Sequence, residues 1–259
     1  MNTAYFIING KVIDICYSEI YSKKIEKIMG YNRENVIAKS PCMEIILSAD
    51  SIIIKYDNVI TEFYHINSTD IYPIIYSAIY QLMNVDNYIM MHSCVVNNNN
   101  NEGILILGDF GAGKTTLLKE FIANGWVANS TDQSLLKIKN KNLIFVCGST
   151  YSDNQIPNIE CKKIDSIVVI NKILFVDAMV GNGDFLNIAT EEYKIKFRKI
   201  WSNMFWPWST PLIGNMQFLS IKADQLRYMC GICKRITEIF NCINIVRGNK
   251  STCIKEFLF

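Results

Sequence analysis

A glycine-rich run followed by Lys and Thr is the part of the sequence whose residue types and spacing could do chemistry. It fits the pattern G-x-x-x-x-G-K-[ST] without a mismatch, and its glycines let a loop turn backbone N–H groups inward onto phosphate oxygens. Lys114 supplies a positive charge for the β- and γ-phosphates, and the Thr115 hydroxyl is placed for Mg²⁺. The pattern predicts a nucleotide-binding loop made of Gly108, Asp109, Phe110, Gly111, Ala112, Gly113, Lys114, Thr115 and Thr116.

The elements around this loop fit its chemistry. Residues 103–107 form an apolar run typical of a strand, and residues 116–123 have a helical pattern that Asn124-Gly125 would end. Further strands are expected in quick succession, with no helices between them. The fold class is therefore α/β (mixed α+β), with the loop in a mixed, partly antiparallel sheet. The expected strands are 90–96, 134–138, 143–147, 166–170 and 172–179.

The first part of the chain is rich in β-strand patterns. Apolar runs occupy residues 4–16, around a hairpin signal at Asn9-Gly10, and residues 43–67. A helix is expected after Asp70, which divides the chain into a β-rich N-terminal segment, 1–68, packed on a P-loop kinase-like domain, 69–259. Near the end of the chain, helices are expected from about residue 190 and over 223–240, followed by a strand over 242–246.

The motifs near the loop resemble the kinase domain of the HPr kinase/phosphorylase family and its small relatives, the HPr-kinase-like peptide kinases. The family's core is akin to phosphoenolpyruvate carboxykinase. The similarity in order and spacing covers about residues 90–137. It rests on Met91-His92-Ser93-Cys94-Val95-Val96, the phosphate loop with its strand, Gly125-Trp126, and Ser130-Thr131-Asp132-Gln133.

The resemblance implies ATP in the loop, Mg²⁺ at Thr115 and Asp132, and His92 and Lys114 beside the phosphates. Asp132 would orient or deprotonate the acceptor hydroxyl, most simply Ser or Thr of a peptide or protein. Thr131 stands where the family usually has a first acid. That departure keeps two alternatives open: a nucleotide-binding regulatory or interaction module that has lost transfer activity, and a small-molecule kinase of the same fold.

A second acid is a rival for the metal. Asp177 follows the apolar run 173–176, a pattern that could bind Mg²⁺ through water, although an Asp at a strand end is the simpler interpretation. Asp109 lies inside the loop and is most simply a solvated variable position.

Composition excludes several classes. The 259 residues are 50% hydrophobic and 19% charged, with a net charge of +2, which argues against disorder and against a basic nucleic-acid binder. No run approaches the roughly 18 to 20 apolar residues of a membrane span, and no secretory signal is apparent. We therefore expect a cytoplasmic protein. The glycine-rich loop predicts a nucleotide as one partner, and the resemblance implies a peptide or protein as the other. The resemblance also implies self-association into a homo-oligomer.

Three other features have simple structural interpretations. Cys230 and Cys233, two of nine cysteines, are expected as a helix-buried pair rather than a metal or redox site. The cluster Trp201–Trp208 is expected to cover the edge of the core, with a docking platform for a peptide or protein as the alternative. The basic residues Lys194, Lys196, Arg198 and Lys199 are expected on a solvated helix face, with a site for an anionic substrate as the alternative.

Overall fold

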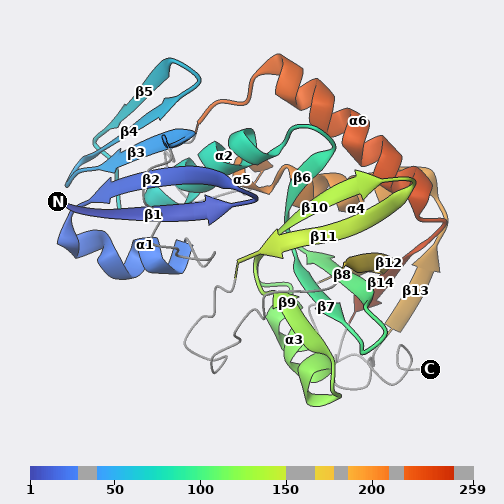
Figure 1. The fold of residues 1–259 in the computed structure, drawn as a ribbon. Helices are drawn as coiled ribbons and strands as arrows, with labels where there is room; N and C mark the ends of the chain where they lie inside the picture. Colours follow the sequence, from blue (N-terminus) through green and yellow to red (C-terminus); the bar gives the residue numbers. More distant parts are fainter. Residues whose placement is uncertain (29–39, 150–166, 178–185, 210–218, 248–259) are drawn as a thin grey trace. The chain divides into compact units, whose positions relative to one another are not determined.

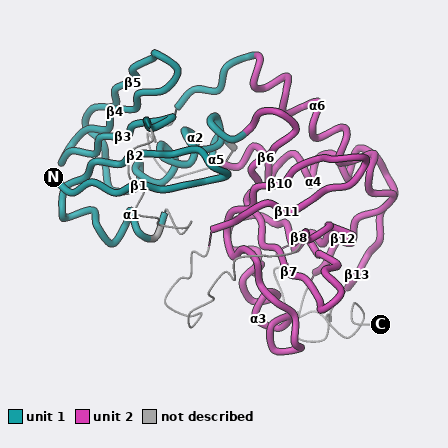
Figure 2. Tube along the Cα trace, viewed as in Figure 1, with its two compact units in different colours: residues 1–83, 207–223 teal, residues 84–206, 224–259 magenta. Residues whose placement is uncertain are grey.

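The computed structural model describes residues 1–28, 40–149, 167–177, 186–209 and 219–247. The chain forms two compact units (Figure 2), one made of residues 1–83 and 207–223, the other of residues 84–206 and 224–259. The expected division after residue 68 differs from these units, because the helix that follows it belongs to the first unit. That division into domains stays a prediction.

In the residues that the structure describes, the first unit contains a five-stranded sheet together with short and longer helices (Figure 1). Its strand order is β1-β2-β3-β4-β5, with only β2 and β3 parallel. Asn9 and Gly10 both have positive φ, which gives the β1–β2 hairpin that the sequence predicts. The elements are β1 (Asn2–Ile8), β2 (Lys11–Tyr17), η1 (Glu19–Tyr21), α1 (Ser22–Ile28), β3 (Met43–Leu47), β4 (Ser51–Tyr56), β5 (Val59–Tyr64) and α2 (Ile71–Met83).

Among the described residues, the second unit contains a nine-stranded sheet and the glycine-rich loop that follows one of its strands. Its strands follow the order β6-β10-β11-β12-β8-β7-β9, and β14 pairs with both β12 and β13. The elements are β6 (Tyr88–His92), β7 (Cys94–Asn97), β8 (Glu102–Gly108), α3 (Lys114–Ala123), β9 (Val127–Ser130), β10 (Gln133–Lys139), β11 (Asn142–Gly148), β12 (Val168–Asp177), β13 (Leu186–Thr190), α4 (Tyr193–Met204), α6 (Ala223–Ile239) and β14 (Ile243–Arg247); α5 (Trp206–Ser209) begins in this unit.

The sheet is mixed, which confirms the expected fold class. β8 and β14 run parallel to β12, whereas β6, β7, β9, β10, β11 and β13 make antiparallel pairs. β12 is one strand, where we expected two on either side of Asn171. Its register with β8 shifts between Ile170 and Lys172, and the Asn171 side chain accepts a hydrogen bond from the Gly103 N–H at 3.3 Å. A bulge therefore absorbs the polar residue without ending the strand. Residues 166, 178 and 179 of the expected strands lie outside the described residues.

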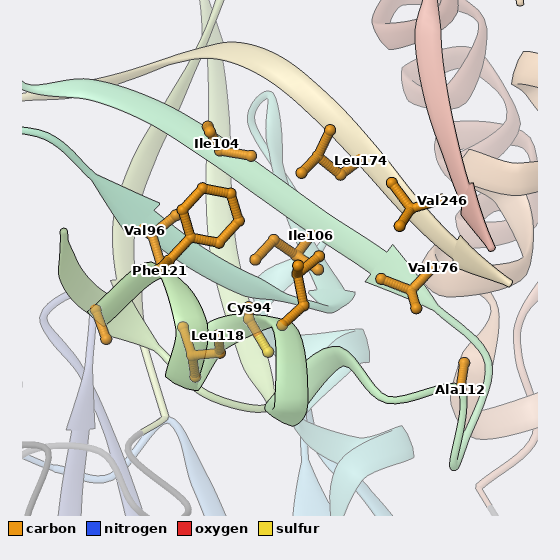
Figure 3. Close-up of a cluster of buried hydrophobic side chains, with 12 residues drawn as sticks. Cys94, Val96, Ile104, Ile106, Ala112, Leu118, Phe121, Leu174, Val176 and Val246 are labelled. Atoms are coloured by element: carbon orange, nitrogen blue, oxygen red, sulfur yellow. The ribbon is translucent and has the colours of Figure 1, made fainter. Parts of the chain in front are cut away.

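A buried apolar cluster joins the helix after the phosphate loop to the sheet (Figure 3). Leu117, Leu118 and Phe121 of α3 pack against buried side chains of β7, β8, β12 and β14. Figure 3 shows Ala112 of the loop and Val176 of β12 at the same end of the strands. This packing fixes the start of α3, and with it the glycine-rich loop, beside the strand ends.

Within the described residues, no helix is long and apolar enough to cross a membrane. Seven cysteines lie in the described parts of the chain, while Cys161 and Cys253 lie outside them. Cys233 is buried in α6, and burial raises its pKa to about 12, so it stays a thiol at neutral pH. The helix-buried interpretation fits Cys233, whereas Cys230 on the same helix is only half-buried.

Candidate functional site

The glycine-rich loop has the strand–loop–helix geometry of a phosphate-binding loop. β8 ends at Gly108, and α3 begins at Lys114 directly after Gly113, whose φ is +94°. Between them, the Ala112 N–H donates to the Asp109 carbonyl at 3.1 Å and closes a tight turn. A Cβ on Gly108 would lie 2.6 Å from the Val176 carbonyl oxygen, so a side chain there would collide with β12. The loop therefore needs its first glycine for a close approach of two backbones.

Lys114 is buried inside the loop. Its Nζ donates to the Gly108 carbonyl at 2.7 Å and to the Asp109 carbonyl at 3.2 Å. These are bonds that phosphate oxygens can replace, because an ammonium group interacts more strongly with an anion than with a neutral carbonyl. Thr115 and Thr116 are exposed at the first turn of α3, where N–H groups and the helix dipole favour anions.

The start of the loop is held from outside by a helix. The buried Asn203 of α4 accepts a hydrogen bond from the Gly108 N–H at 3.1 Å through Oδ1, and its Nδ2 donates to the Lys199 carbonyl at 3.0 Å. The amide of Gly108 is thus satisfied by a side chain instead of facing the phosphate position. The glycine pattern of the sequence does not predict that Asn203 holds the start of the loop.

His92 and Asp132 lie next to each other beside the loop. His92 Nε2 is 3.4 Å from Asp132 Oδ1, and the imidazole is 4% exposed while the Asp132 side chain is 15% exposed. His92 ends β6, and the Ser93 N–H donates to the Asp132 backbone carbonyl at 2.9 Å. The turn before β10 therefore delivers Asp132 to the end of β6, and the structure brings together two of the residues that the sequence singled out.

Burial and nearby charges, including that of Lys114 in the loop, shift the pKa of His92. Burial lowers the pKa of His92, the hydrogen bond to Asp132 raises it by less, and the nearby charge of Lys114 lowers it further. His92 is therefore neutral at neutral pH. A neutral imidazole that donates from Nε2 to a carboxylate has an unprotonated Nδ1, and His92 Nδ1 is buried with no hydrogen-bond partner among the described residues. The Asp132 carboxylate is partly open to solvent.

Thr131 stabilises the turn before β10 through hydrogen bonds of its backbone and side chain. It is buried, and both its N–H and its hydroxyl donate to the Ser149 carbonyl, at 3.0 and 3.3 Å. Its own carbonyl accepts a bond from Cys94 Sγ at 3.0 Å. These bonds use Thr131 to fix the turn, and Asp132 is the carboxylate that the turn presents.

Part of the tryptophan cluster borders the site. Trp206 is buried, and its ring centroid lies 4.6 Å from that of His92 at an interplanar angle of 36°. Trp201 is stacked between Phe197 and Phe205 along the helix, at 6.0 and 5.4 Å. The sequence predicted this cluster as a cover for the core or as a docking platform. It did not predict that the Trp206 ring packs against the His92 ring.

Asp177, the rival acid, lies at the end of β12 with its carboxylate already engaged. Oδ2 is 3.3 Å from Lys199 Nζ and 3.3 Å from Arg247 Nη2. Two cations on one carboxylate oxygen compete with a metal ion for it. Its role as a metal ligand stays a prediction, and the pairing matches the simpler interpretation of an Asp at a strand end.

The expected basic face of α4 is only partly solvated. Lys194 and Arg198 are exposed, but Lys196 is 6% exposed. Lys196 donates to the carbonyls of Thr237, Phe240 and Asn241 at 3.3, 2.8 and 2.8 Å. The expectation was wrong for Lys196, because the C-terminus of α6 lies over it and leaves carbonyls that a cation satisfies.

The residues at the loop fit magnesium that arrives with a nucleotide. Among the described residues, no three His, Cys, Asp or Glu side chains gather closely enough to hold a metal ion by themselves. Mg²⁺ is commonly bound through one or two protein oxygens together with substrate phosphates. The exposed Thr115 hydroxyl and the Asp132 carboxylate are oxygens of that kind, so this donor set fits the metal only when phosphates supply other ligands.

No family model and no curated protein matches this chain in sequence. Among solved structures, it is similar to the Hpr(Ser) kinase/phosphatase from Coxiella burnetii. The two share 19% sequence identity over 40% of this chain and 77% of that chain, with a TM-score of 0.29. A likeness of this size supports no conclusion about activity. The fold and site themselves define a mixed-sheet protein in which a G-x-x-x-x-G-K-T loop lies beside a His–Asp pair.

Proposed function

We propose that the protein transfers a phosphoryl group from ATP, with Mg²⁺, to a hydroxyl group, most simply Ser or Thr of a peptide or protein. The observation that supports this most strongly is the His92–Asp132 contact at 3.4 Å, in the same electrostatic environment as Lys114 of the phosphate loop. A loop that only binds a nucleotide has no need of an oriented carboxylate, whereas transfer to a hydroxyl requires a group that accepts its proton.

Each residue has a distinct part in the proposed reaction. The loop amides and Lys114 hold the phosphates, and Thr115 and Asp132 would hold Mg²⁺, which supplies charge neutralisation when bound. Asp132 accepts the proton of the acceptor hydroxyl. His92 remains neutral and donates to Asp132, which keeps the carboxylate oriented. Trp206 covers the imidazole and keeps water from its ring. The cytoplasmic location and homo-oligomeric state expected from the sequence belong to this proposal.

The proposal is tested by label transfer. The purified full chain is incubated with Mg²⁺, γ-labelled ATP and a library of Ser- and Thr-containing peptides, and label on peptide is measured. We expect transfer by the wild type and none by Lys114→Ala, with Lys194→Ala as a matched control because Lys194 is exposed on α4. Binding of Mg·ATP without transfer to any peptide or protein would contradict the proposal and favour the inactive binding module. Transfer to small-molecule alcohols alone would favour the small-molecule kinase.

A further inference from the structure

Three charged side chains meet at the ends of β12 and β14, away from the His92–Asp132 pair. Asp177 Oδ2 lies 3.3 Å from both Lys199 Nζ and Arg247 Nη2. The Lys199 ammonium also lies 4.0 Å from the centroid of the Phe175 ring. With one carboxylate and two cations, this charged trio (Asp177, Lys199 and Arg247) has a net charge of +1, which suits a further anion.

The charged trio lies at the same edge of the sheet as the phosphate loop. β8, β12 and β14 are mutually parallel, Gly108 is paired with Val176, and Asp177 is paired with Arg247. Since neighbouring strands are about 4.8 Å apart, the backbone of Arg247 is about 10 Å from the loop's first residue. β7 occupies the other edge of β8, and Ser93, just before β7, bonds to Asp132. The loop therefore lies between the carboxylate and the charged trio.

A second contact brings Lys199 close to the loop independently of strand register. Asn203 is one helical turn after Lys199 on α4, and residues four apart lie on the same helix face. The Asn203 side chain bonds both to the Lys199 carbonyl and to the Gly108 N–H. Lys199 is thus one turn of helix away from a residue that touches the phosphate loop.

Lys199 and Arg247 have N–H donors that their contacts with Asp177 do not use. A Lys ammonium has three N–H donors and an Arg guanidinium has five, whereas the contacts with Asp177 involve one nitrogen of each. Arg247 Nε is buried and has no hydrogen-bond partner among the described residues. The side chains of Lys199 and Arg247 are 25% and 38% exposed, so a ligand can reach them. The planar fork of Arg suits phosphate oxygens.

We infer that Lys199 and Arg247 form a second anion subsite that binds a phosphate group which the glycine-rich loop does not itself hold, while Asp177 keeps the two cations in place. This inference rests on the proposed function and extends its binding site. The phosphate is either the terminal phosphate of the bound nucleotide or that of a second ligand, such as free phosphate or a phosphorylated product.

Calorimetric titration distinguishes these sources. Wild type, Arg247→Gln and Lys199→Gln are titrated at constant ionic strength with Mg·ADP, with a non-hydrolysable Mg·ATP analogue, and, when saturated with ADP, with inorganic phosphate. Lys194→Gln is the matched control because it removes the same charge from an exposed position of the same helix. Arg247→Lys retains the charge, and a thermal melt of each variant checks that it is folded.

If the nucleotide is the source, we expect each Gln variant to bind the ATP analogue about tenfold more weakly than the wild type, a difference of about 1.4 kcal/mol. ADP binding should be unchanged. The affinity of Arg247→Lys for the ATP analogue should lie between those of the wild type and Arg247→Gln. If a second ligand is the source, the ADP-saturated wild type binds phosphate and the Gln variants do not. The inference is overturned if folded Gln variants bind all three ligands as the wild type does. A wild type that binds no nucleotide would refute the proposed function as well, and with it this extension.

Discussion

The pH dependence of stability gives a direct test of the buried, neutral His92. Burial lowers its folded-state pKa below the unfolded value of about 6.5. Between those two pKa values the unfolded chain binds more protons than the folded chain, so stability increases with pH there. The contribution of His92 is therefore fully present above pH 6.5 and is lost as the pH falls toward the folded-state pKa.

The magnitude follows from one proton. A histidine that binds no proton in the folded chain lowers the free energy of unfolding by at most about 1.4 kcal/mol between pH 7.5 and 5.5. His92→Gln removes this titration, so we expect its free energy of unfolding to change less than that of the wild type over the interval, by up to about 1.4 kcal/mol. His65→Gln is the matched control, because His65 is the other histidine of the sequence and is exposed.

Urea denaturation followed by circular dichroism at pH 5.5, 6.5 and 7.5 measures the difference. His92→Gln is expected to be less stable at every pH because it disturbs a packed site, so the readout is the slope with pH and not the absolute value. Equal slopes for wild type and His92→Gln would refute the conclusion that His92 is buried, neutral and able to donate to Asp132.

Three further predictions concern the elements that support the site. Asn203→Leu leaves the buried Gly108 N–H without an acceptor and should lower the free energy of unfolding by about 1–3 kcal/mol. Asn203→Asp retains the acceptor oxygen and should recover part of this loss. An equal loss in both variants would contradict the role of Asn203 as the acceptor for Gly108. Lys196→Met should cost about 3 kcal/mol in urea denaturation because three carbonyls at the end of α6 lose a cationic donor, while exposed Lys194→Met should change little. Asp177→Asn should leave the Mg²⁺ dependence of nucleotide binding unchanged, and a marked increase in the Mg²⁺ required would instead make Asp177 a metal ligand.

Much of the site could be predicted from sequence because its signals are local. The spacing of Gly108, Gly113 and Lys114 requires a strand before the loop and a helix after it, and β8 and α3 are found there. The mixed sheet was predictable because successive apolar runs without helices cannot all be parallel neighbours. The β1–β2 turn was predictable from Asn9-Gly10 for the same local reason.

The supporting residues could not be predicted, because their roles depend on contacts far apart along the chain. Asn203 meets Gly108 across 95 residues, and Lys196 meets the end of α6 across more than 40. Neither type of contact leaves a period or spacing in the sequence. Asn171 misled the strand assignment because a polar residue at a bulge has the same pattern as one in a turn.

The rate of phosphoryl transfer by Asp132→Asn is the measurement that tests the central claim most directly. Asn has nearly the shape of Asp and can still contact His92, but it cannot accept the proton of the acceptor hydroxyl. A positioned base contributes about 10²–10⁴-fold, so we predict that transfer from labelled ATP to the best peptide of the library falls at least about 100-fold. Wild-type transfer rates in Asp132→Asn would contradict the assignment of Asp132 as the catalytic carboxylate.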